Sequence, residues 1–272
     1  MINRKTKRRL SYVCIAVAAI LLLNYLTETI PFSLHASSSE EKVDFTVLCY
    51  NIKSKGNGYS ERQVEIAKVI LNESPDVAFL CEYKKSLSGH LDSIMTKVGH
   101  YKSFYRKRSG CIFYSKYDID SVAAIDVGTS KGKYKINNKV HVLTPHGTIT
   151  IVGCHLTSSG IGIIEGYKRR IIEADSIYRL CMNEQRPLIV MGDMNDVSGS
   201  TPINRIKKAG LKDAWWEGGC GYGATFHGKG LRLRIDHILY DYKGLELVGV
   251  KVIGNDLSDH NALIARFRIN KH

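Results

Sequence analysis

Short apolar runs whose ends carry polar side chains are the feature that most constrains how this chain can fold. In the stretch RPLIVMGDMNDVSGSTP, the apolar run at 188–191 stops at a glycine and is followed by Asp193 and Asn195. A short apolar run bounded by Pro and Gly is typical of an interior β-strand. Because alternate side chains of a strand point the same way, we expect Asp193 and Asn195 to leave the strand end together. A simple turn, which Asp, Asn and Gly all favour, is the alternative for this stretch alone.

Polar residues interrupt five further apolar runs in the same way, at or beside their ends. They are Asn51 after VLCY, Glu82 after VAFLC, His155 after IVGC, Asp236 and His237 within RIDHILY, and Ser258, Asp259 and His260 before the last run. Each one alone is compatible with a turn, a surface charge or a half-buried histidine. Burying unpaired carboxylates costs on the order of several kcal/mol, however. We therefore expect these polar groups to share one purpose, such as a bound cation.

Strand-like and helix-like stretches alternate from residue 43 onward, with no break in composition. Strands are expected at 44–52, 75–83, 110–119, 188–191, 231–241 and 260–269, together with a hairpin around residues 145–147. Helices are expected at 60–74, 165–185 and 201–210. Ser60 is the expected N-cap of the first helix, whose apolar face would comprise Val64, Ile66, Ala67, Ile70 and Leu71. This alternation predicts a single α/β domain over residues 43–272.

The first 42 residues have a different character. Residues 1–9 are a basic flank, residues 10–26 an apolar run and residues 27–42 a polar tether. A basic flank before an apolar run is typical of a secretory signal or a signal anchor. The 17 positions of the apolar run are at the low end for a membrane span. They are more than is usual for the apolar core of a cleaved signal peptide. We expect an uncleaved anchor, with cleavage after Ala36 and secretion as the alternative, although Leu34 is large for a cleavage site. Either way, the positive-inside rule places the body outside the cytoplasm, in the periplasm or at the cell surface.

Charge and cysteine content narrow the class of protein further. The net charge of +13 includes five cations in the first nine residues, which leaves 13 − 5 = +8 for the remainder. A basic body favours anionic partners such as nucleic acid, phosphoesters or lipid headgroups, although it also serves solubility. The seven cysteines include no CxxC pair, which argues against a zinc site. Most of them fall inside strand-like runs, where cysteine behaves as a small buried hydrophobe.

The residue types at the polar strand ends suit a particular kind of metal ion. Carboxylate and amide oxygens with neutral histidines are ligands for Mg²⁺ or Mn²⁺. Such an ion usually keeps several waters and binds one or two carboxylates together with a substrate phosphate. The sequence therefore predicts a metal-dependent site for phosphoesters.

Six stretches, in this order, resemble the endonuclease/exonuclease/phosphatase superfamily. They are LCYNI, DVAFLCE, IVGCHLTS, IVMGDMND, RIDHILY and SDHNAL, and the resemblance covers nearly everything from Val43 to Ile269. The Gly-Asp-x-Asn turn with a later Ser-Asp-His is its most specific part. Members of this superfamily include DNase I, sphingomyelinases and inositol-polyphosphate phosphatases. The resemblance implies a four-layer α/β/β/α sandwich of two mixed sheets flanked by helices, with the site at one rim.

The resemblance also implies a metal site. Glu82 resembles the principal ligand of Mg²⁺ or Mn²⁺, with Asn51 and Asp259 close to it. Two residues of the sequence depart from the superfamily pattern. Cys81 precedes Glu82 where many members have Gln, and His237 stands where Tyr is common. A structural role for His237 is as well supported as a catalytic one.

Five further residues take catalytic roles from the resemblance. Asp193 would orient or deprotonate the attacking water, and Asn195 would position that water and the phosphate. His260 would contact a phosphoryl oxygen or the nucleophile and be held by Asp236, because a carboxylate fixes the tautomer and orientation of a histidine. His155 would hydrogen-bond the phosphate and could protonate the leaving group. Hydrolysis would proceed in line, without a covalent enzyme intermediate.

The predicted function is a monomeric, Mg²⁺-dependent phosphodiesterase, with a nuclease preferred because the body is basic. A row of cations could follow a phosphate backbone: Lys84, Lys85, Lys102, Arg106, Lys107 and Arg108. Four aromatic residues expected near the rim could instead stack a base or insert among lipids: Trp215, Trp216, Tyr222 and Phe226. A lipid-headgroup (sphingomyelinase-like) or sugar- or inositol-phosphate enzyme is therefore the alternative. Retention of every matched catalytic position argues against a non-catalytic binding protein of the same fold, and the polar strand ends argue against a structural envelope protein.

Overall fold

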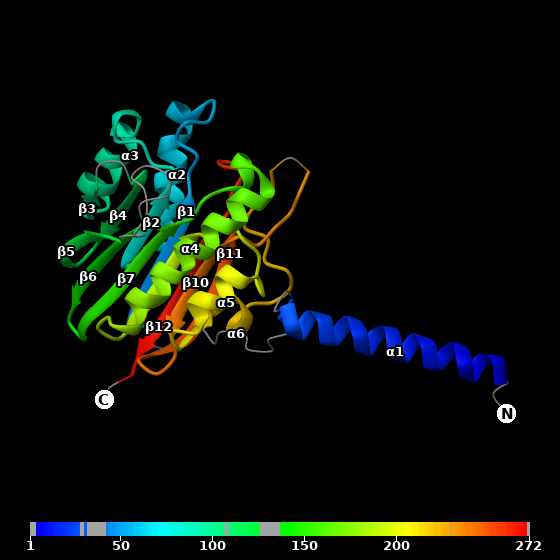
Figure 1. The fold of residues 1–272 in the computed structure, drawn as a ribbon. Helices are drawn as coiled ribbons and strands as arrows, with labels where there is room; N and C mark the ends of the chain where they lie inside the picture. The colour runs from blue at the N-terminus through cyan, green and yellow to red at the C-terminus, as the bar shows by residue number, and fades with distance from the viewer. Residues whose placement is uncertain are drawn as a thin grey trace.

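Two six-stranded sheets make up the body of the protein (Figure 1). The computed structural model describes residues 4–27, 30–31, 42–106, 109–125, 137–228 and 230–270. The first sheet has the order β11-β12-β1-β2-β4-β3. Its strands are β1 (Phe45–Asn51), β2 (Val77–Cys81), β3 (Lys102–Tyr105), β4 (Cys111–Ser115), β11 (Leu245–Ile253) and β12 (Ala262–Ile269).

The second sheet has the order β5-β6-β7-β8-β10-β9. Its strands are β5 (Asp118–Ala124), β6 (Asn138–Thr144), β7 (Gly147–His155), β8 (Leu188–Asp193), β9 (Leu211–Asp213) and β10 (Asp236–Asp241). Each sheet is mixed, since β1 pairs with β2 and β7 with β8 in parallel, while their other pairings are antiparallel. The predicted class of two mixed sheets flanked by helices is confirmed.

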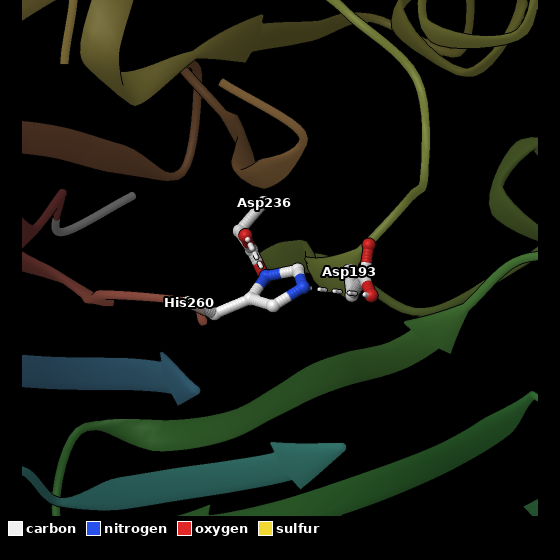
Figure 2. A group of neighbouring side chains, drawn as sticks. All are labelled: Asp193, Asp236 and His260. Carbon is white, nitrogen blue, oxygen red and sulfur yellow. Dashed lines mark hydrogen bonds and ion pairs between the residues drawn. The ribbon is translucent and has the colours of Figure 1, made fainter. Parts of the chain in front are cut away.

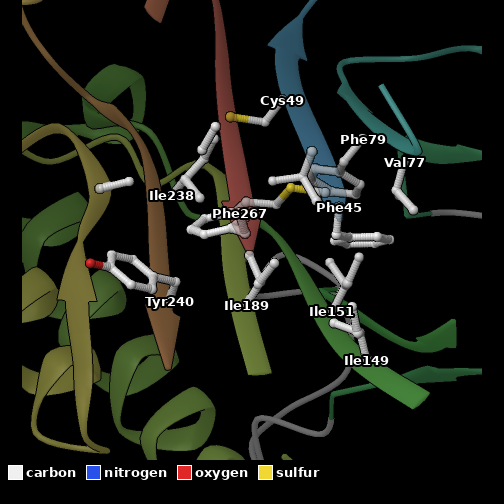
Figure 3. Close-up of a cluster of buried hydrophobic side chains, with 14 of the residues drawn as sticks. Phe45, Cys49, Val77, Phe79, Ile149, Ile151, Ile189, Ile238, Tyr240 and Phe267 are labelled. Atoms are coloured by element: carbon white, nitrogen blue, oxygen red, sulfur yellow. The ribbon is translucent and has the colours of Figure 1, made fainter. Parts of the chain in front are cut away.

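Apolar side chains from the inner faces of the two sheets form the central core (Figure 3). Phe79 and Phe113 of the first sheet belong to it together with Ile151, Met191 and Ile238 of the second. Each sheet contributes alternate residues to this layer, because successive side chains of a strand point to opposite faces. The residues between them face the helices. The four strand cysteines, Cys49, Cys81, Cys111 and Cys154, are buried, as the sequence predicts, and they are free thiols.

Helices cover both outer faces. α2 (Tyr59–Glu73), α3 (Gly89–Ser93) and η2 (Ile94–Val98) pack on the first sheet, and α4 (Ile163–Met182) and α5 (Thr201–Lys207) on the second. The remaining helices are α1 (Arg4–Thr27), α6 (Ala214–Gly218), η1 (Lys85–Leu87) and η3 (Ser159–Ile161). In the part of the chain that the structure describes, no helix is both long and apolar enough to cross a membrane. The predicted cleavage site and most of the tether lie outside the described residues.

The first body helix differs from its prediction at two positions. Gly58, with φ 67°, precedes the helix, which begins at Tyr59 rather than after a Ser60 cap. The Tyr59 side chain turns inward, and its hydroxyl lies 2.8 Å from Ser88 Oγ. This start rotates the buried face so that Gln63 is buried and Val64 is 40% exposed. Gln63 is stable there because its Oε1 accepts a hydrogen bond from the Leu91 amide.

Candidate active site

Strand register brings three of the predicted residues side by side at one edge of the second sheet. His155 lies opposite Asp193 in the parallel pair β7–β8, and Asp236 lies opposite Asp193 in the antiparallel pair β8–β10. The sequence placed Asp236 inside a longer strand, but β10 begins at this residue. An antiparallel neighbour starts where its partner ends, so the amino end of β10 meets the carboxyl ends of β7 and β8.

Glycine is required at the end of β8. Gly192 has φ 133°, and a Cβ there would lie 2.1 Å from the carbonyl oxygen of Cys154. Strands β7 and β8 therefore approach each other more closely at this point than any side chain permits. This close approach places Asp193 directly beside His155.

Asn51 links the site to the first sheet. It ends β1, while Glu82 directly follows β2, its parallel neighbour. Asn51 Nδ2 donates a hydrogen bond of 2.9 Å to Asp193 Oδ2 and a longer one of 3.3 Å to Glu82 Oε1. The buried side-chain amide of Asn51 thus connects the carboxyl ends of β1 and β2 to the edge of the second sheet.

His260 completes the cluster from the turn before β12 (Figure 2). Its Nδ1 lies 2.8 Å from Asp236 Oδ2, and its Nε2 lies 3.9 Å from Asp193 Oδ2. His155 Nε2 lies 3.8 Å from the same Asp193 oxygen. The ring of Phe226 packs edge-on against the His260 ring at 5.0 Å between centroids. Asp193 therefore lies between two imidazoles, one of which is held by a second carboxylate.

The charges of this cluster set its protonation. Burial acts to lower the pKa of His260, but the adjacent Asp236, helped by Asp193, raises that pKa to about 10. The imidazole is therefore protonated at neutral pH. Burial and the nearby Asp236 charge raise the pKa of Asp193, and His260, His155 and the Asn51 hydrogen bond partly offset this. A carboxylate with a raised pKa is a better proton acceptor than an ordinary one.

Asp259 lies beside this cluster and has a partner that the sequence did not indicate. Lys53 Nζ lies 2.5 Å from Asp259 Oδ2. Burial would raise the pKa of Asp259, but the hydrogen bond and charge of Lys53, with His260 nearby, lower it. The two residues are 206 positions apart in the chain, so nothing local in the sequence connects them.

Backbone strain gathers at the site. Five non-glycine residues in the described ranges have positive φ, and three of them are Lys53 (φ 46°), Glu82 (φ 53°) and Asn195 (φ 51°). Such conformations cost on the order of 1–3 kcal/mol each and are typical of functional sites. In this conformation the backbone N–H of Asn195 donates a hydrogen bond to Asp193 Oδ1 at 2.9 Å. The side-chain Nδ2 of Asn195 donates to the carbonyl of Leu156 at 3.0 Å.

A buried network holds the loop that follows β8. Arg170 of α4 donates to Asp196 Oδ2 at 2.8 Å, and His237 Nε2 lies 2.9 Å from the Asp196 carbonyl. Arg234 donates one hydrogen bond to Ser198 of the same loop. It donates another, of 2.7 Å, to Asp213 Oδ2. His237 is fully buried in this network, where its Nδ1 lies 3.3 Å from Asp213 Oδ2. Of this set the sequence indicated only His237, because helix and strand patterns alone do not reveal that a charged residue is buried.

The resemblance implies a divalent metal ion, and the residues of the site fit one. Within the described residues, Asp193, Asp236 and His260 form the group of three whose ligand atoms all lie within 4.8 Å of one another. Asp236 Oδ1 is buried there and has no hydrogen-bond partner among the described residues. The two carboxylates are suitable oxygen donors for such a cation, while the protonated His260 lies beside them. The cluster could therefore hold a metal ion.

The predicted peripheral residues separate into three groups. Lys84, Lys85 and Arg106 are exposed, whereas Lys102 pairs with Asp118. Lys107 and Arg108 lie outside the described residues. Phe226 is at the site, but Trp215 is 6% exposed, belongs to the central core and donates to the Gly221 carbonyl at 3.1 Å. The prediction that Trp215 is available at the rim is wrong.

Two packed mixed sheets with carboxylates, amides and imidazoles at one rim are the architecture of a phosphoesterase. The model of the Endonuclease/Exonuclease/phosphatase family matches residues 48–260, and the chain belongs to that family. A comparison with curated proteins finds no match.

Solved structures share the fold at low sequence identity. A humanised TDP2 of D. rerio is 16% identical with a TM-score of 0.67, covering 82% of this chain and 98% of that one. D. rerio TDP2 complexed with a single-strand DNA product is 15% identical, with a TM-score of 0.66 and the same coverage. Sphingomyelinase C from Streptomyces griseocarneus is 16% identical, with a TM-score of 0.64, and also covers 82% of this chain and 98% of its own.

Proposed function

We propose that the protein is a metal-dependent phosphodiesterase. The observation that carries this proposal is the buried arrangement of Asp193 between His155 and the Asp236-held His260. Family membership supports hydrolysis of a phosphoester as the reaction class. A phosphodiester is preferred because the basic body can hold anionic groups that flank the bond to be cleaved.

Glu82, which Asn51 contacts, and Asp259 would hold Mg²⁺ or Mn²⁺, and the Asp193 and Asp236 carboxylates offer further oxygen ligands. The bound ion would supply positive charge opposite the phosphoryl oxygens.

The protein's own residues provide the proton transfer and the orientation. Asp193, whose pKa is raised, accepts the proton of the attacking water. The Asn195 side chain, fixed on the Leu156 carbonyl, lies next to Asp193 and positions the water and the phosphate. Protonated His260 donates from Nε2 to a phosphoryl oxygen while Asp236 holds its Nδ1. His155 contacts the phosphate from the other side of Asp193 and protonates the leaving group.

Removal of the metal tests the proposed reaction. We expect the purified protein to hydrolyse bis-p-nitrophenyl phosphate, EDTA to abolish the reaction, and Mg²⁺ or Mn²⁺ to restore it. The measurement is p-nitrophenol release against metal concentration. Turnover that persists in EDTA would contradict the metal requirement.

A polynucleotide is the substrate that the sequence favours. The exposed Lys84, Lys85 and Arg106 support it, since they lie on loops that follow β2 and β3. D. rerio TDP2, of the same fold, was crystallised with a single-strand DNA product. Replacing the three cations with alanine should weaken binding of single-stranded DNA and flatten its salt dependence, because fewer counterions are released. Fluorescence anisotropy at several salt concentrations, with a catalytically inactive variant, measures this. Binding without any salt dependence would exclude a polynucleotide.

We propose that the body acts outside the cytoplasm. The support is the basic flank at residues 1–9 before the apolar run at 10–26. A reporter enzyme that works only outside the cytoplasm, fused after His272, should therefore be active, and deletion of residues 1–26 should abolish reporter activity. An active reporter in the deletion would show that export does not depend on this segment. Carbonate extraction separates an anchor, which stays in the membrane fraction, from a cleaved signal peptide.

A further inference from the structure

An aliphatic surface adjoins the active site. Ile161, Ile163 and Ile164, in the segment between β7 and α4, are 47%, 78% and 73% exposed. Single exposed aliphatic residues are ordinary, but three within four consecutive positions form a patch. They follow His155, the catalytic residue that ends β7, by only a few positions. The three isoleucines therefore differ from the single exposed apolar residues elsewhere on the body, because they are grouped and lie close to the active site.

A neighbouring loop extends this patch. Arg170 bonds the Thr157 carbonyl and Ser159 on one side and Asp196 on the other, which places the exposed Val197 beside the isoleucine segment. We call Ile161, Ile163, Ile164 and Val197 the aliphatic edge.

The isoleucine segment is held in a fixed conformation. Gly162 has φ 110° and joins η3 to α4 in a backbone conformation that other residues rarely adopt. A Cβ on Gly166 would lie 2.8 Å from the Ser158 carbonyl, so the first turn of α4 packs tightly on the loop. Little conformational entropy remains to be lost when this segment meets a partner.

Charge and chemistry together identify the partner. Exposed cations lie on the other loops of this rim: Lys55, Lys84, Lys85, Arg106 and Arg232. Cations alone fit either a polynucleotide or an anionic lipid surface. A single-stranded polynucleotide is usually held by base stacking on exposed aromatic rings, but Trp215 is buried, Trp216 and Tyr222 are only partly exposed, and Phe226 packs on His260. Exposed aliphatic side chains on a rim that also carries cations are instead the composition of a surface that enters the lipid interface.

We propose that the aliphatic edge inserts into the headgroup and upper acyl region of a bilayer containing anionic phospholipids. This inference rests on the proposed function, because insertion would present the active site to phosphodiesters at the membrane surface. It keeps the phosphodiesterase reaction but replaces the polynucleotide that the basic composition favours with a phosphodiester of the lipid surface, and the experiments below separate the two substrates. Burial of each isoleucine side chain adds to the attraction in proportion to the apolar area removed from water.

Site-specific tryptophan fluorescence tests the insertion. The full-length Ile164→Trp variant is mixed with vesicles of phosphatidylcholine and phosphatidylglycerol, with or without brominated phosphatidylcholine. We expect a blue shift of the added emission and its quenching by bromine. Met182→Trp is the matched control, since Met182 is 54% exposed at the opposite end of the same helix. Both variants keep the N-terminal apolar run, so anchoring by that run affects them equally. Equal responses from the two variants would overturn the proposal.

A second pair of measurements separates this inference from the proposed function. Insertion needs no turnover, so inserted protein that fails to hydrolyse bis-p-nitrophenyl phosphate would refute the phosphodiesterase alone. A protein that hydrolyses bis-p-nitrophenyl phosphate, but whose tryptophan at position 164 shows neither the blue shift nor the quenching, would refute insertion into the lipid surface. It would leave the phosphodiesterase proposal intact. A single-stranded oligonucleotide added without vesicles completes the test. If it shifts the Ile164→Trp emission while vesicles do not, the partner is a nucleic acid and the lipid proposal is wrong.

Discussion

Replacing Asp193 with alanine should lower kcat for bis-p-nitrophenyl phosphate by about 10²–10⁴-fold, the range for loss of a general base. The His260→Ala variant should lose a similar amount, because the protonated imidazole that faces the phosphate disappears. The two residues act as a unit, with His260 Nε2 only 3.9 Å from Asp193 Oδ2. The double variant should therefore be little slower than either single one. Steady-state kinetics with Mg²⁺ or Mn²⁺ measures all three.

A matched control keeps this result interpretable. Asp120 lies exposed on β5, so Asp120→Ala removes a carboxylate without touching the site. It should retain wild-type turnover. Circular dichroism should show that each variant is folded. Full activity in folded Asp193→Ala would rule out Asp193 as the base and remove the central step of the proposed mechanism.

The largest expected loss of stability follows from replacing Arg234 with methionine. Arg234 and its partner Asp213 are 2% and 1% exposed, and their closest atoms lie 2.7 Å apart. Removing one member of a buried ion pair leaves the other charge buried without compensation, which costs about 3–5 kcal/mol. Urea unfolding measures the change. Arg268→Met is the control, because Arg268 forms an exposed pair with Glu246 at 2.7 Å, and its loss should cost about 0–1 kcal/mol.

The same pair makes stability depend on pH. Burial acts to raise the pKa of Asp213, but Arg234 and His237 outweigh it and hold that pKa well below the ordinary value of 3.8. A group whose pKa is lower in the folded state adds stability above its unfolded pKa and loses it as the pH falls. Acid should therefore destabilise the wild-type protein progressively below about pH 4, the unfolded pKa of an aspartate. In Arg234→Met this loss should be much smaller; an unchanged acid profile would show that another carboxylate dominates.

The sequence predicted the sheets and the approximate position of the site because both depend on local signals. Apolar runs of strand length marked the interior strands, and the polar residue at the end of a run marked the carboxyl ends of β1, β2, β7 and β8. Asp193 and His155 follow parallel strands, whose carboxyl ends must meet at one edge. The pairing of Asp236 with Asp193 needed the antiparallel register of β10, which no local pattern in RIDHILY specifies.

Residues that depend on distant contacts were not predictable. Lys53 belongs to the site only because the fold brings the turn after β1 against Asp259. Trp215 was expected close to the rim, where aromatic residues could stack a base or insert among lipids. Neighbouring glycines pack on the tryptophan instead: a Cβ on Gly219 or Gly223 would lie 2.5 Å or 2.1 Å from Trp215. The composition of a loop does not reveal which of its residues the core accepts.

The order of strands in the first sheet has a consequence for the newly made chain. β1 pairs with β2 on one side and on the other with β12, which follows the other described strands in the sequence. A chain translated as far as β10 contains Asn51, Glu82 and Asp193, but it lacks His260 and leaves one edge of β1 without a neighbour. Nascent chains should accordingly be inert until β12 has been translated. Under the proposed function, a chain could therefore hydrolyse a phosphoester only after β12 has joined the first sheet.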